Sequence, residues 1–439
     1  MMLPPPANQL RSGDDAELAT VVKRLVDELG NNKRATRESA RRRLMALGPR
    51  VLDLLPPPAA ITNPASRVAI RRLRSALERN AATRSARASL VNLQGRHSLE
   101  KIVAQLSHQT DNRLVLADDL PTDLKHPFSV DIRNRTFWQA VEEISRTARV
   151  RLVSSGGTAI LRPGRPTGHS SRIAVSGPFR ISATATAPRP LANRKTWLIP
   201  IRLQWEAEPR LRPLFLVCRP SRCQATGRIE DDKVALTPRS PDATLEVPLA
   251  AESAVETSEN GSAPPRLRLD FQSQGRRPPT SLSLTGTADV WLAADRQPFV
   301  FLTRTVQRPV LKRRAGVAVA LTAAHVDTKS NKRHDVTMRI RVQYESGGPS
   351  FESHRLWMLY NQAHLLADSE TGKIRRMSYD RFDTPRIGDG TAELVYHFRN
   401  VAGPIDRWRF VYEAPTQILK VAVPWMTRDL TVPLPRSAG

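Results

Sequence analysis

The two cysteines are the first residues of this 439-residue chain whose type and spacing could do chemistry. Cys218 and Cys223 stand in the stretch LVCRPSRCQ. Two thiols are too few to complete a metal site without further ligands. The pair predicts either a small disulfide across a hairpin tip, if the protein is exported, or two free thiols. The sequence is compatible with both states.

A group of acidic side chains in RFDTPRIGDGTAE is the second candidate, because oxygen ligands that lie close in sequence can hold Ca²⁺. The stretch lacks a D-x-[DN]-x-[DN]-G calcium loop and mixes arginines with the acids. Asp and Gly are also the residues that turns require. We therefore interpret the stretch as turns and predict no metal site there. The acidic residues concerned are Asp380, Asp383, Asp389 and Glu393.

Histidines give a weaker signal. His354 and His364 lie ten positions apart and could face one another across a hairpin. The nine histidines of the chain form neither an H-E-x-x-H nor an H-x-H motif. Strand alternation produces such a facing pair easily by chance, so we predict no metal at these histidines.

A carbohydrate site is a further possibility at Trp205, where Glu206, Glu208 and Arg210 follow the indole ring. Trp205 continues an alternating apolar row, however, and this pattern favours a place in the core. Glycoside hydrolysis also requires two carboxylates that meet in space. The chain has no G-x-S-x-G, phosphate-loop or dinucleotide motif. The sequence therefore predicts a non-enzymatic protein, without catalytic residues or a cofactor, and a carbohydrate-binding or hydrolytic protein is an alternative.

The strongly basic composition raises the alternative of nucleic-acid binding. The chain has 68 Lys and Arg against 42 Asp and Glu, a formal charge of +26. This excess is spread along the chain, and the densest clusters, at 41–43 and 71–74, have no aromatic residue near them. Nucleic-acid surfaces concentrate charge and add aromatic rings for stacking. We therefore favour solvated arginine-rich faces over a nucleic-acid role.

Compartment and membrane signals are sparse. No apolar run reaches the length of about 18 residues that suggests a membrane-spanning helix. The opening MMLPPPANQLRSG lacks a basic segment followed by an apolar segment, so no secretory signal is visible. Two interpretations follow: a cytoplasmic protein, or a start that differs from the true one.

The chain divides into regions by its pattern. Residues 1–13 are rich in proline and predicted to be disordered. Short amphipathic helices with Gly and Pro between them follow over 14–88. They resemble HEAT-type helical hairpins at about one and a half repeats, fewer than a free-standing solenoid needs. A plain helical bundle describes this region equally well.

Residues 89–163 predict a small α+β module with the order strand, helix, strand, then strand, helix, strand, strand. Ser98 and Thr136 can cap the two helices, each of which is apolar on one face. Phe128 and Val130 alternate with polar residues in a half-buried strand. Gly156-Gly157 marks the last turn.

Two lines of this module, HSLEKIVAQLSHQTDNRLVL and FSVDIRNRTFWQAVEEISRTARVRLV, resemble the secretin and TonB short N-terminal domain. The segment Thr136–Val141 matches the start of its second helix. The resemblance implies a small α+β module that makes protein contacts in the bacterial cell envelope and carries no catalytic residues. Where the family usually has glycine, this chain reads Asp111-Asn112, and asparagine tolerates the positive φ of the turn.

From residue 170 the apolar period changes to two. Short alternating strands separated by turns predict two antiparallel β-sandwiches, over 170–305 and 315–434. SGPFRI and DTPRIGDGTAELVYHF also resemble segments of large bacterial envelope proteins of uncharacterised function.

The predicted fold class is thus multidomain α+β: helical hairpins, the small module and two β-sandwiches. The predicted role is binding or assembly in the envelope or periplasm through a protein partner, with a cytoplasmic location as the alternative. Edge strands of the small module would accept a partner strand. The predicted contact residues are Phe128, Val130 and Trp138.

Overall fold

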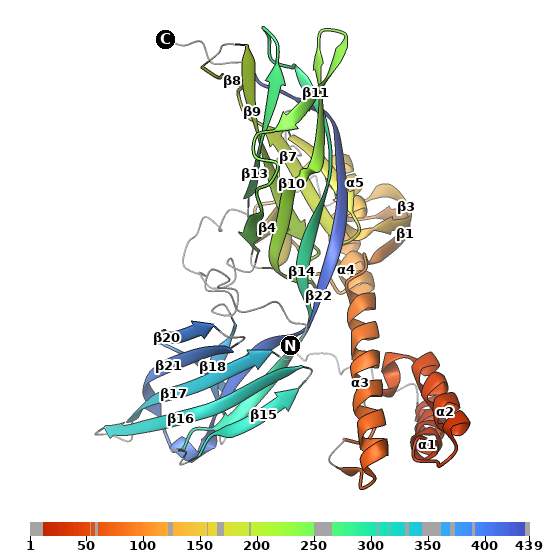
Figure 1. The fold of residues 1–439 in the computed structure, drawn as a ribbon, viewed down its shortest axis with the longest axis vertical. Coiled ribbons are helices and arrows are strands. Elements are labelled where there is room, and N and C mark those ends of the chain that lie inside the picture. The colour runs from red at the N-terminus through yellow and green to blue at the C-terminus, as the bar shows by residue number, and fades with distance from the viewer. Residues whose placement is uncertain are drawn as a thin grey trace. The chain divides into compact units, whose positions relative to one another are not determined.

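A computed structural model of the chain describes residues 12–52, 54–57, 60–121, 126–155, 157–164, 171–192, 195–249, 266–304, 306, 308–314, 316–329, 333–344, 361–368, 374–388 and 391–434. Of the segment 1–13 that was predicted to be disordered, residues 1–11 lie outside the described residues, and Ser12 and Gly13 belong to a helix. Asp389 and His354 also lie outside the described residues. The chain forms two compact units that divide between Ser85 and Ala86, and each is described by itself. The multidomain α+β class is confirmed, with helices toward the N-terminus and antiparallel sheets after them (Figure 1).

The first unit is helical, as the apolar periodicity predicts. Its helices are α1 (Ser12–Glu28), α2 (Arg34–Leu47), the short 3-10 turn η1 (Pro49–Val51) and α3 (Pro64–Ser85). One face of each α-helix supplies the core, whose fully buried members include Leu25, Leu44, Ile70 and Leu77. The Asn63 side chain accepts hydrogen bonds from the first free amides of α3, at Ala65 and Ser66.

Several arginines of this unit close its loops. Arg37 donates to the carbonyls of Asn31 and Asn32 at 2.8 Å each. Arg67 donates to the Ile61 carbonyl and Arg74 to the Leu55 carbonyl, at 2.8 Å in both cases. Part of the arginine excess therefore satisfies carbonyls at helix ends and loops, which would otherwise depend on water.

The α+β module has the predicted order. It consists of β1 (Leu90–His97), α4 (Leu99–Thr110), β2 (Leu114–Leu116), β3 (Phe128–Thr136), α5 (Phe137–Thr147), β4 (Val150–Ser155) and β5 (Thr158–Pro163). β1 pairs with β3, while β5 lies between β2 and β4 in a second sheet. Ser98 caps α4 by accepting from the Lys101 amide, and the Gln139 side chain accepts from the Thr136 amide at the start of α5.

The remaining strands form large antiparallel sheets. The first group is β6 (Ser171–Ser176), β7 (Phe179–Ala185), β8 (Arg189–Pro190), β9 (Thr196–Ala207), β10 (Arg212–Ile229), β11 (Asp232–Pro238), β12 (Leu245–Pro248), β13 (Arg266–Gln274) and β14 (Ser281–Leu302). The second group is β15 (Val310–Arg314), β16 (Val317–Lys329), β17 (Arg333–Tyr344), β18 (Ala363–Asp368), β19 (Ile374–Ser378), β20 (Arg381–Gly388), β21 (Thr391–Ala402), the 3-10 turn η7 (Ile405–Arg407) and β22 (Trp408–Thr431).

Two long strands join the two predicted β-regions. β14 and β22 pair along almost their whole lengths, from Ser281 with Thr431 to Leu302 with Arg409. One end of this ribbon belongs to a core around Trp205 and Trp425, and the other end to a core around Tyr396 and Phe410. The division predicted near 305–315 therefore does not separate two independent sandwiches, because the C-terminal strand returns to complete the first core.

Strand order follows from this ribbon. The described strands around the first core run β22-β14-β10-β11-β13-β9-β7-β6. β6 lies beside β22, and Arg172 Nε donates to the Asp429 carbonyl at 3.0 Å. Around the second core, the sheet β15-β16-β17-β21-β20 faces the end of the other sheet formed by β19-β18-β22-β14. In the described part of the chain, no helix has the length and apolar character needed to cross a membrane.

Candidate interaction surface

The strand pair β1–β3 of the α+β module forms the candidate interaction surface. Its inner positions alternate as the sequence predicts, with Ile132 fully buried and Phe128 and Val130 half-buried against the module core. The intervening residues Ser129 and Asp131 are exposed. Phe128 and Val130 thus lie at the margin of a core, where a partner could cover them further.

β3 is open along its second edge, and in β1 one residue, Asn92, has its main chain bound by a side chain of α4. The Gln109 side chain, from α4, accepts from the Asn92 amide at 3.0 Å and donates to the Asn92 carbonyl at 2.9 Å. These two bonds satisfy the main chain of Asn92, which lies where the β1–β3 pairing is irregular, between Val91 and Leu93. Among the described strands, β3 pairs with β1 and with no other. An unpaired strand edge presents main-chain donors and acceptors to another chain.

The open edge is mainly basic. Arg133 and Arg135 on β3 and Arg96 on β1 are exposed. Asp131 is the one carboxylate in β3, and Arg133 Nε lies 2.8 Å from it. Hydrogen bonds from Arg133 and then Gln94 hold the pKa of Asp131 below its usual value. The net positive charge favours a partner segment that carries acidic side chains.

Trp138, the third predicted contact residue, is unavailable to a partner. Its side chain is fully buried, and its ring meets Phe137 edge-on at 4.9 Å between centroids. The indole Nε1 donates to the Pro178 carbonyl at 3.1 Å. Trp138 therefore joins the module to the turn between β6 and β7 of the same chain, because a large amphipathic ring in a helix serves core packing first.

The Asp111-Asn112 turn also has a role that the sequence did not indicate. Asp111, and not Asn112, takes the positive φ, at 56°, in the position directly after α4. Asn112 is instead buried at 1% exposure. Its side-chain amide donates to Ser89 Oγ at 3.1 Å and to Glu208 Oε2 at 3.2 Å.

Glu208 is the centre of this junction between the module and the β-region. Its side chain is fully buried. One carboxylate oxygen accepts from the Ser89 amide at 3.0 Å, and the other accepts from Ser89 Oγ and Arg210 Nε at 2.7 Å each. Arg210 also donates to the Arg87 carbonyl, and its own amide donates to Asn112 Oδ1 at 3.0 Å. A buried carboxylate is tolerated here because several donors replace its water.

A second buried ion cluster lies beside the first. The Arg180 guanidinium, on β7, contacts Glu142 of α5 at 2.6 Å and also Glu206 of β9. The Arg180 side chain is 7% exposed. Burial opposes its charge, but Glu206 and Glu142 overcome this and raise the pKa of Arg180. The two ion clusters and Trp138 together hold the α+β module against β7 and β9, within one compact unit.

These contacts answer the prediction of a carbohydrate site at Trp205. Glu206 and Glu208 are each bound to a different arginine, and both are buried. Trp205 is 3% exposed and packs edge-on against Phe179. The carboxylates thus serve to join parts of the protein, and they do not meet across an open cleft as glycoside hydrolysis requires.

The predicted acidic group around residue 380 is distributed among separate partners. Asp383 contacts Arg381 at 2.8 Å and His397 at 3.0 Å, and hydrogen bonds from these two residues lower the pKa of Asp383. Glu393 contacts Arg339, while Asp380 accepts from the Arg399 amide. No group of three or more metal-ligating side chains lies together in the described residues.

His364 lies on β18 and is 4% exposed. Its Nδ1 is 3.3 Å from Arg376 Nη2. Burial, followed by the Arg376 charge, lowers the pKa of His364, and Glu413 opposes this shift. His364 is therefore neutral in the folded protein at neutral pH, and its predicted partner His354 lies outside the described residues.

The free energy of unfolding is expected to decrease as the pH falls below about 6.5, because unfolded His364 then takes up a proton that the folded state resists. The contribution of this residue is complete above that pH and is lost toward the lower pKa of the folded state. Urea denaturation of wild type and His364→Asn between pH 7.5 and pH 5 measures it. In the variant, the dependence of the free energy of unfolding on pH should be weaker than in wild type by up to about 1.4 kcal/mol per pH unit. The same dependence in both proteins would contradict the assignment.

Cys218 and Cys223 lie on one strand, β10, and not across a hairpin tip, the place that the disulfide alternative assumed. Cys218 pairs with Ala288 and Cys223 with Gly286, so the intervening residues of β10 bulge outward. The bulge brings the two sulfur atoms to 3.7 Å. Both residues are free thiols here, and a disulfide in an oxidised protein stays a prediction.

The two thiols are expected to be unreactive in the folded, reduced protein. Both side chains are buried, which keeps reagents away from the two sulfur atoms. The hydrogen bond between the thiols raises the pKa of Cys218 and lowers the pKa of Cys223, so the expected protection rests on burial. Titration with an aromatic disulfide reagent should detect few thiols before denaturation and both thiols after it. Rapid reaction of both in the folded protein would contradict their burial.

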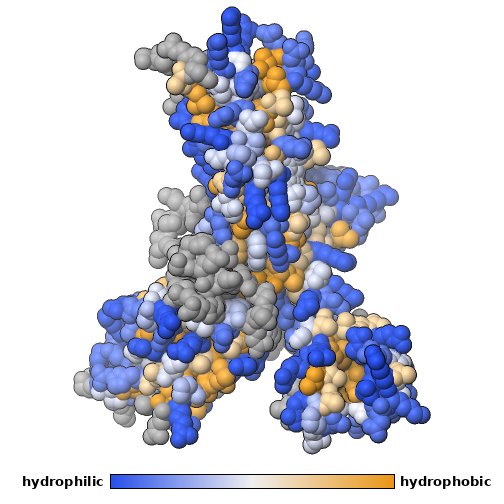
Figure 2. All heavy atoms as spheres, viewed as in Figure 1, coloured by the Kyte–Doolittle hydropathy of each residue, from blue (hydrophilic) through white to orange (hydrophobic). Residues whose placement is uncertain are grey.

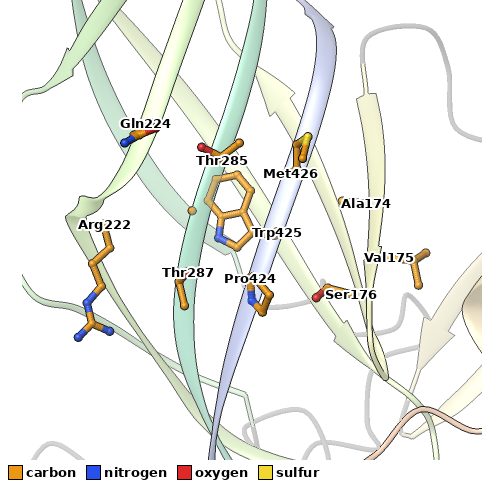
Figure 3. A pocket seen from close by; sticks show the side chains of 11 residues that line it. Ala174, Val175, Ser176, Arg222, Gln224, Thr285, Thr287, Pro424, Trp425 and Met426 are labelled. Carbon is orange, nitrogen blue, oxygen red and sulfur yellow. The ribbon is translucent and has the colours of Figure 1, made fainter.

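A pocket of about 610 Å³ lies where β6, β10, β14 and β22 adjoin (Figure 3). Trp425 and Gly286 lie together in its lining, and a Cβ atom added at Gly286 would come within 2.6 Å of the Trp425 ring. The lining residues include no histidine, cysteine or carboxylate, so the pocket supplies no general acid or base. They are Ala174, Val175, Ser176, Arg222, Gln224, Thr285, Gly286, Thr287, Pro424, Trp425 and Met426.

Comparison with known proteins adds little to this geometry. No family model matches the chain, so membership of the secretin and TonB short N-terminal domain family is not shown, and no curated protein matches its sequence. One weakly similar structure is the atomic model of the Salmonella SPI-1 type III secretion injectisome basal body proteins InvG, PrgH and PrgK. It shares 8% sequence identity, with 79% of this chain and 93% of that chain covered, at a TM-score of 0.14. A similarity of that strength does not establish a common fold.

Proposed function

We propose that this chain is a non-enzymatic binding or assembly protein that uses the open edge of β3 to contact a protein partner in the bacterial cell envelope. The observation that carries the proposal is the unpaired edge of β3. Among the described strands β3 pairs with β1 alone, and its exposed residues include Arg133 and Arg135. The envelope location rests on the sequence resemblance of residues 89–163.

The favoured partner is an extended segment with acidic side chains. An added strand would gain main-chain hydrogen bonds from β3, and its side chains would cover Phe128 and Val130. Arg96, Arg133 and Arg135 would attract acidic residues and repel basic ones. The buried junction at Glu208 supports this role because it keeps the binding edge fixed to the rest of the unit.

Photo-crosslinking in the producing cell tests the proposal. A photoreactive amino acid at Ser129 or Arg133 should join the chain to one and the same protein, whereas Lys23 in α1 serves as the control position. With the photoreactive amino acid at Ser129, the charge reversal Arg133→Glu with Arg135→Glu should remove that product without changing the melting temperature. Products that are equally strong from Lys23, or that persist in the double variant, would refute the proposed edge.

A further inference from the structure

A second open strand edge occurs at β15. This strand pairs with β16 and with no other described strand. None of its five side chains is buried, and four of the five are exposed. Strands usually gain stability by burying at least one face, so β15 depends on its hydrogen bonds to β16 and on few other contacts.

The end of β14 lies on the same core and has only one neighbouring strand among the described residues. The ladder from β10 stops at Ala293, so residues 295–302 of β14 pair with β22 alone. Lys312 Nζ donates to the Val300 carbonyl, and Arg314 Nη1 donates to the Pro298 carbonyl at 3.2 Å. These carbonyls thus point away from β22 and toward side chains of β15, and no ladder between β14 and β15 is formed among the described residues.

Apolar side chains are exposed at both edges. The exposed fractions are 37% for Val300, 41% for Leu302, 41% for Val310 and 54% for Leu311. Figure 2 shows hydrophobic side chains at the surface of the lobe that carries β15, β16 and β17 in Figure 1. We name this group of four residues, with Lys312 and Arg314, the β15 edge.

Basic residues predominate along this part of the chain. Residues 296–326 contain six arginines and lysines and no acidic residue, and one of the six, Arg296, is paired with Glu413 of β22. Lys312 lies over the Phe301 ring, 5.2 Å from its centroid, and Phe301 itself is buried. The exposed apolar groups of this edge are therefore aliphatic, and they are surrounded by cations.

We propose that the β15 edge binds an extended, acidic segment of another protein, which pairs with β15 as an additional strand and covers Val300 and Leu302. Basic residues on an edge strand discourage pairing with a like edge, so a second copy of this chain is disfavoured. Nucleic acid is disfavoured as well, because single strands bind through stacking on exposed aromatic rings. A segment that alternates aliphatic and acidic residues satisfies both the apolar and the charged groups.

The β15 edge is independent of β3 and of the function proposed for it. The full-length chain is mixed with a fluorescent peptide of about ten residues that alternates valine and glutamate. Hydrogen exchange then locates the bound peptide. The expected result is slower exchange over 310–314 at saturating peptide, while a peptide that alternates valine and lysine gives none. Any slower exchange over 128–136 would report the β3 edge separately.

Two variants and one control complete the test. The first variant is Lys312→Glu with Arg314→Glu, and the second is Leu311→Glu. Each should abolish the slower exchange over 310–314 and weaken binding of the valine–glutamate peptide by at least about tenfold. Arg266→Glu, at an exposed position on β13, should leave both unchanged. The proposal would be overturned if a single-stranded oligonucleotide, and not the acidic peptide, slowed exchange over 310–314, or if neither probe did. Self-association of the chain in gel filtration that Leu311→Glu removes would also overturn it.

Discussion

Replacing Glu208 with alanine is expected to lower the free energy of unfolding by about 3–5 kcal/mol, the loss typical when one partner of a buried ion pair is removed. The Glu208 side chain is fully buried and accepts hydrogen bonds from Ser89, Asn112 and Arg210. Without the carboxylate, the Arg210 charge and the polar groups of Ser89 and Asn112 lose this partner in a region with little water. Urea denaturation followed by circular dichroism measures the change.

A matched control separates this buried pair from ordinary surface charges. Glu230 contacts Arg277 at 2.6 Å, but the two side chains are 74% and 76% exposed. The variant Glu230→Ala should therefore change stability by no more than about 1 kcal/mol. Limited proteolysis should cut the Glu208→Ala variant near residues 86–89 or in the module more rapidly than wild type. Equal effects of the two substitutions would refute the structural role assigned to Glu208.

The variant Trp138→Ala is expected to cost about 3–5 kcal/mol, because it removes a large, fully buried ring and leaves a cavity. It also removes the hydrogen bond from the indole to the Pro178 carbonyl. Trp138→Phe should restore much of the packing while lacking that bond, for a loss smaller than that of the alanine variant. Thermal and urea denaturation of the three proteins provide the comparison.

The same experiment distinguishes a core residue from a contact residue. Ser129→Ala, at an exposed position on the open edge, should leave the unfolding transition unchanged. If Trp138→Ala were equally silent, the burial of Trp138 would be wrong, and its predicted role as a partner contact would return.

Local features of this chain were predictable from sequence because they depend on neighbouring residues. Apolar spacing identified the faces of α4 and α5, and Ser98 marked the start of α4. Alternation identified Phe128, Val130 and Ile132 as one side of β3. The multidomain α+β class follows from the sum of such patterns.

The functional arrangement of the module was not predictable, because it depends on residues far apart in the chain. Glu208 and Ser89 are separated by 119 positions, and Trp138 and Pro178 by 40. Gln109 gives no local sign that its side chain binds the main chain of Asn92, 17 positions earlier. The nearest signal in the sequence is a glutamate followed two positions later by an arginine, Glu208 and Arg210.

The shared strands of the β-region were missed for a different reason. Alternation predicts strands but does not show how far a strand continues after a bulge or which strand it pairs with. β22 contains the prolines Pro415 and Pro424 and still runs from one core to the other. The division predicted near 305–315 contains strand β15 of the second core, so it is not the border of an independent domain.

Hydrogen exchange of β3 in complex with its cross-linked partner tests the central claim most directly. The account predicts that amides within residues 128–136 exchange more slowly in the purified complex than in the free chain, because an added strand would use the open edge of β3. The Asn92 amide of β1, already bound by the Gln109 side chain, should change little. A complex in which β3 exchanges as fast as in the free protein would contradict the account.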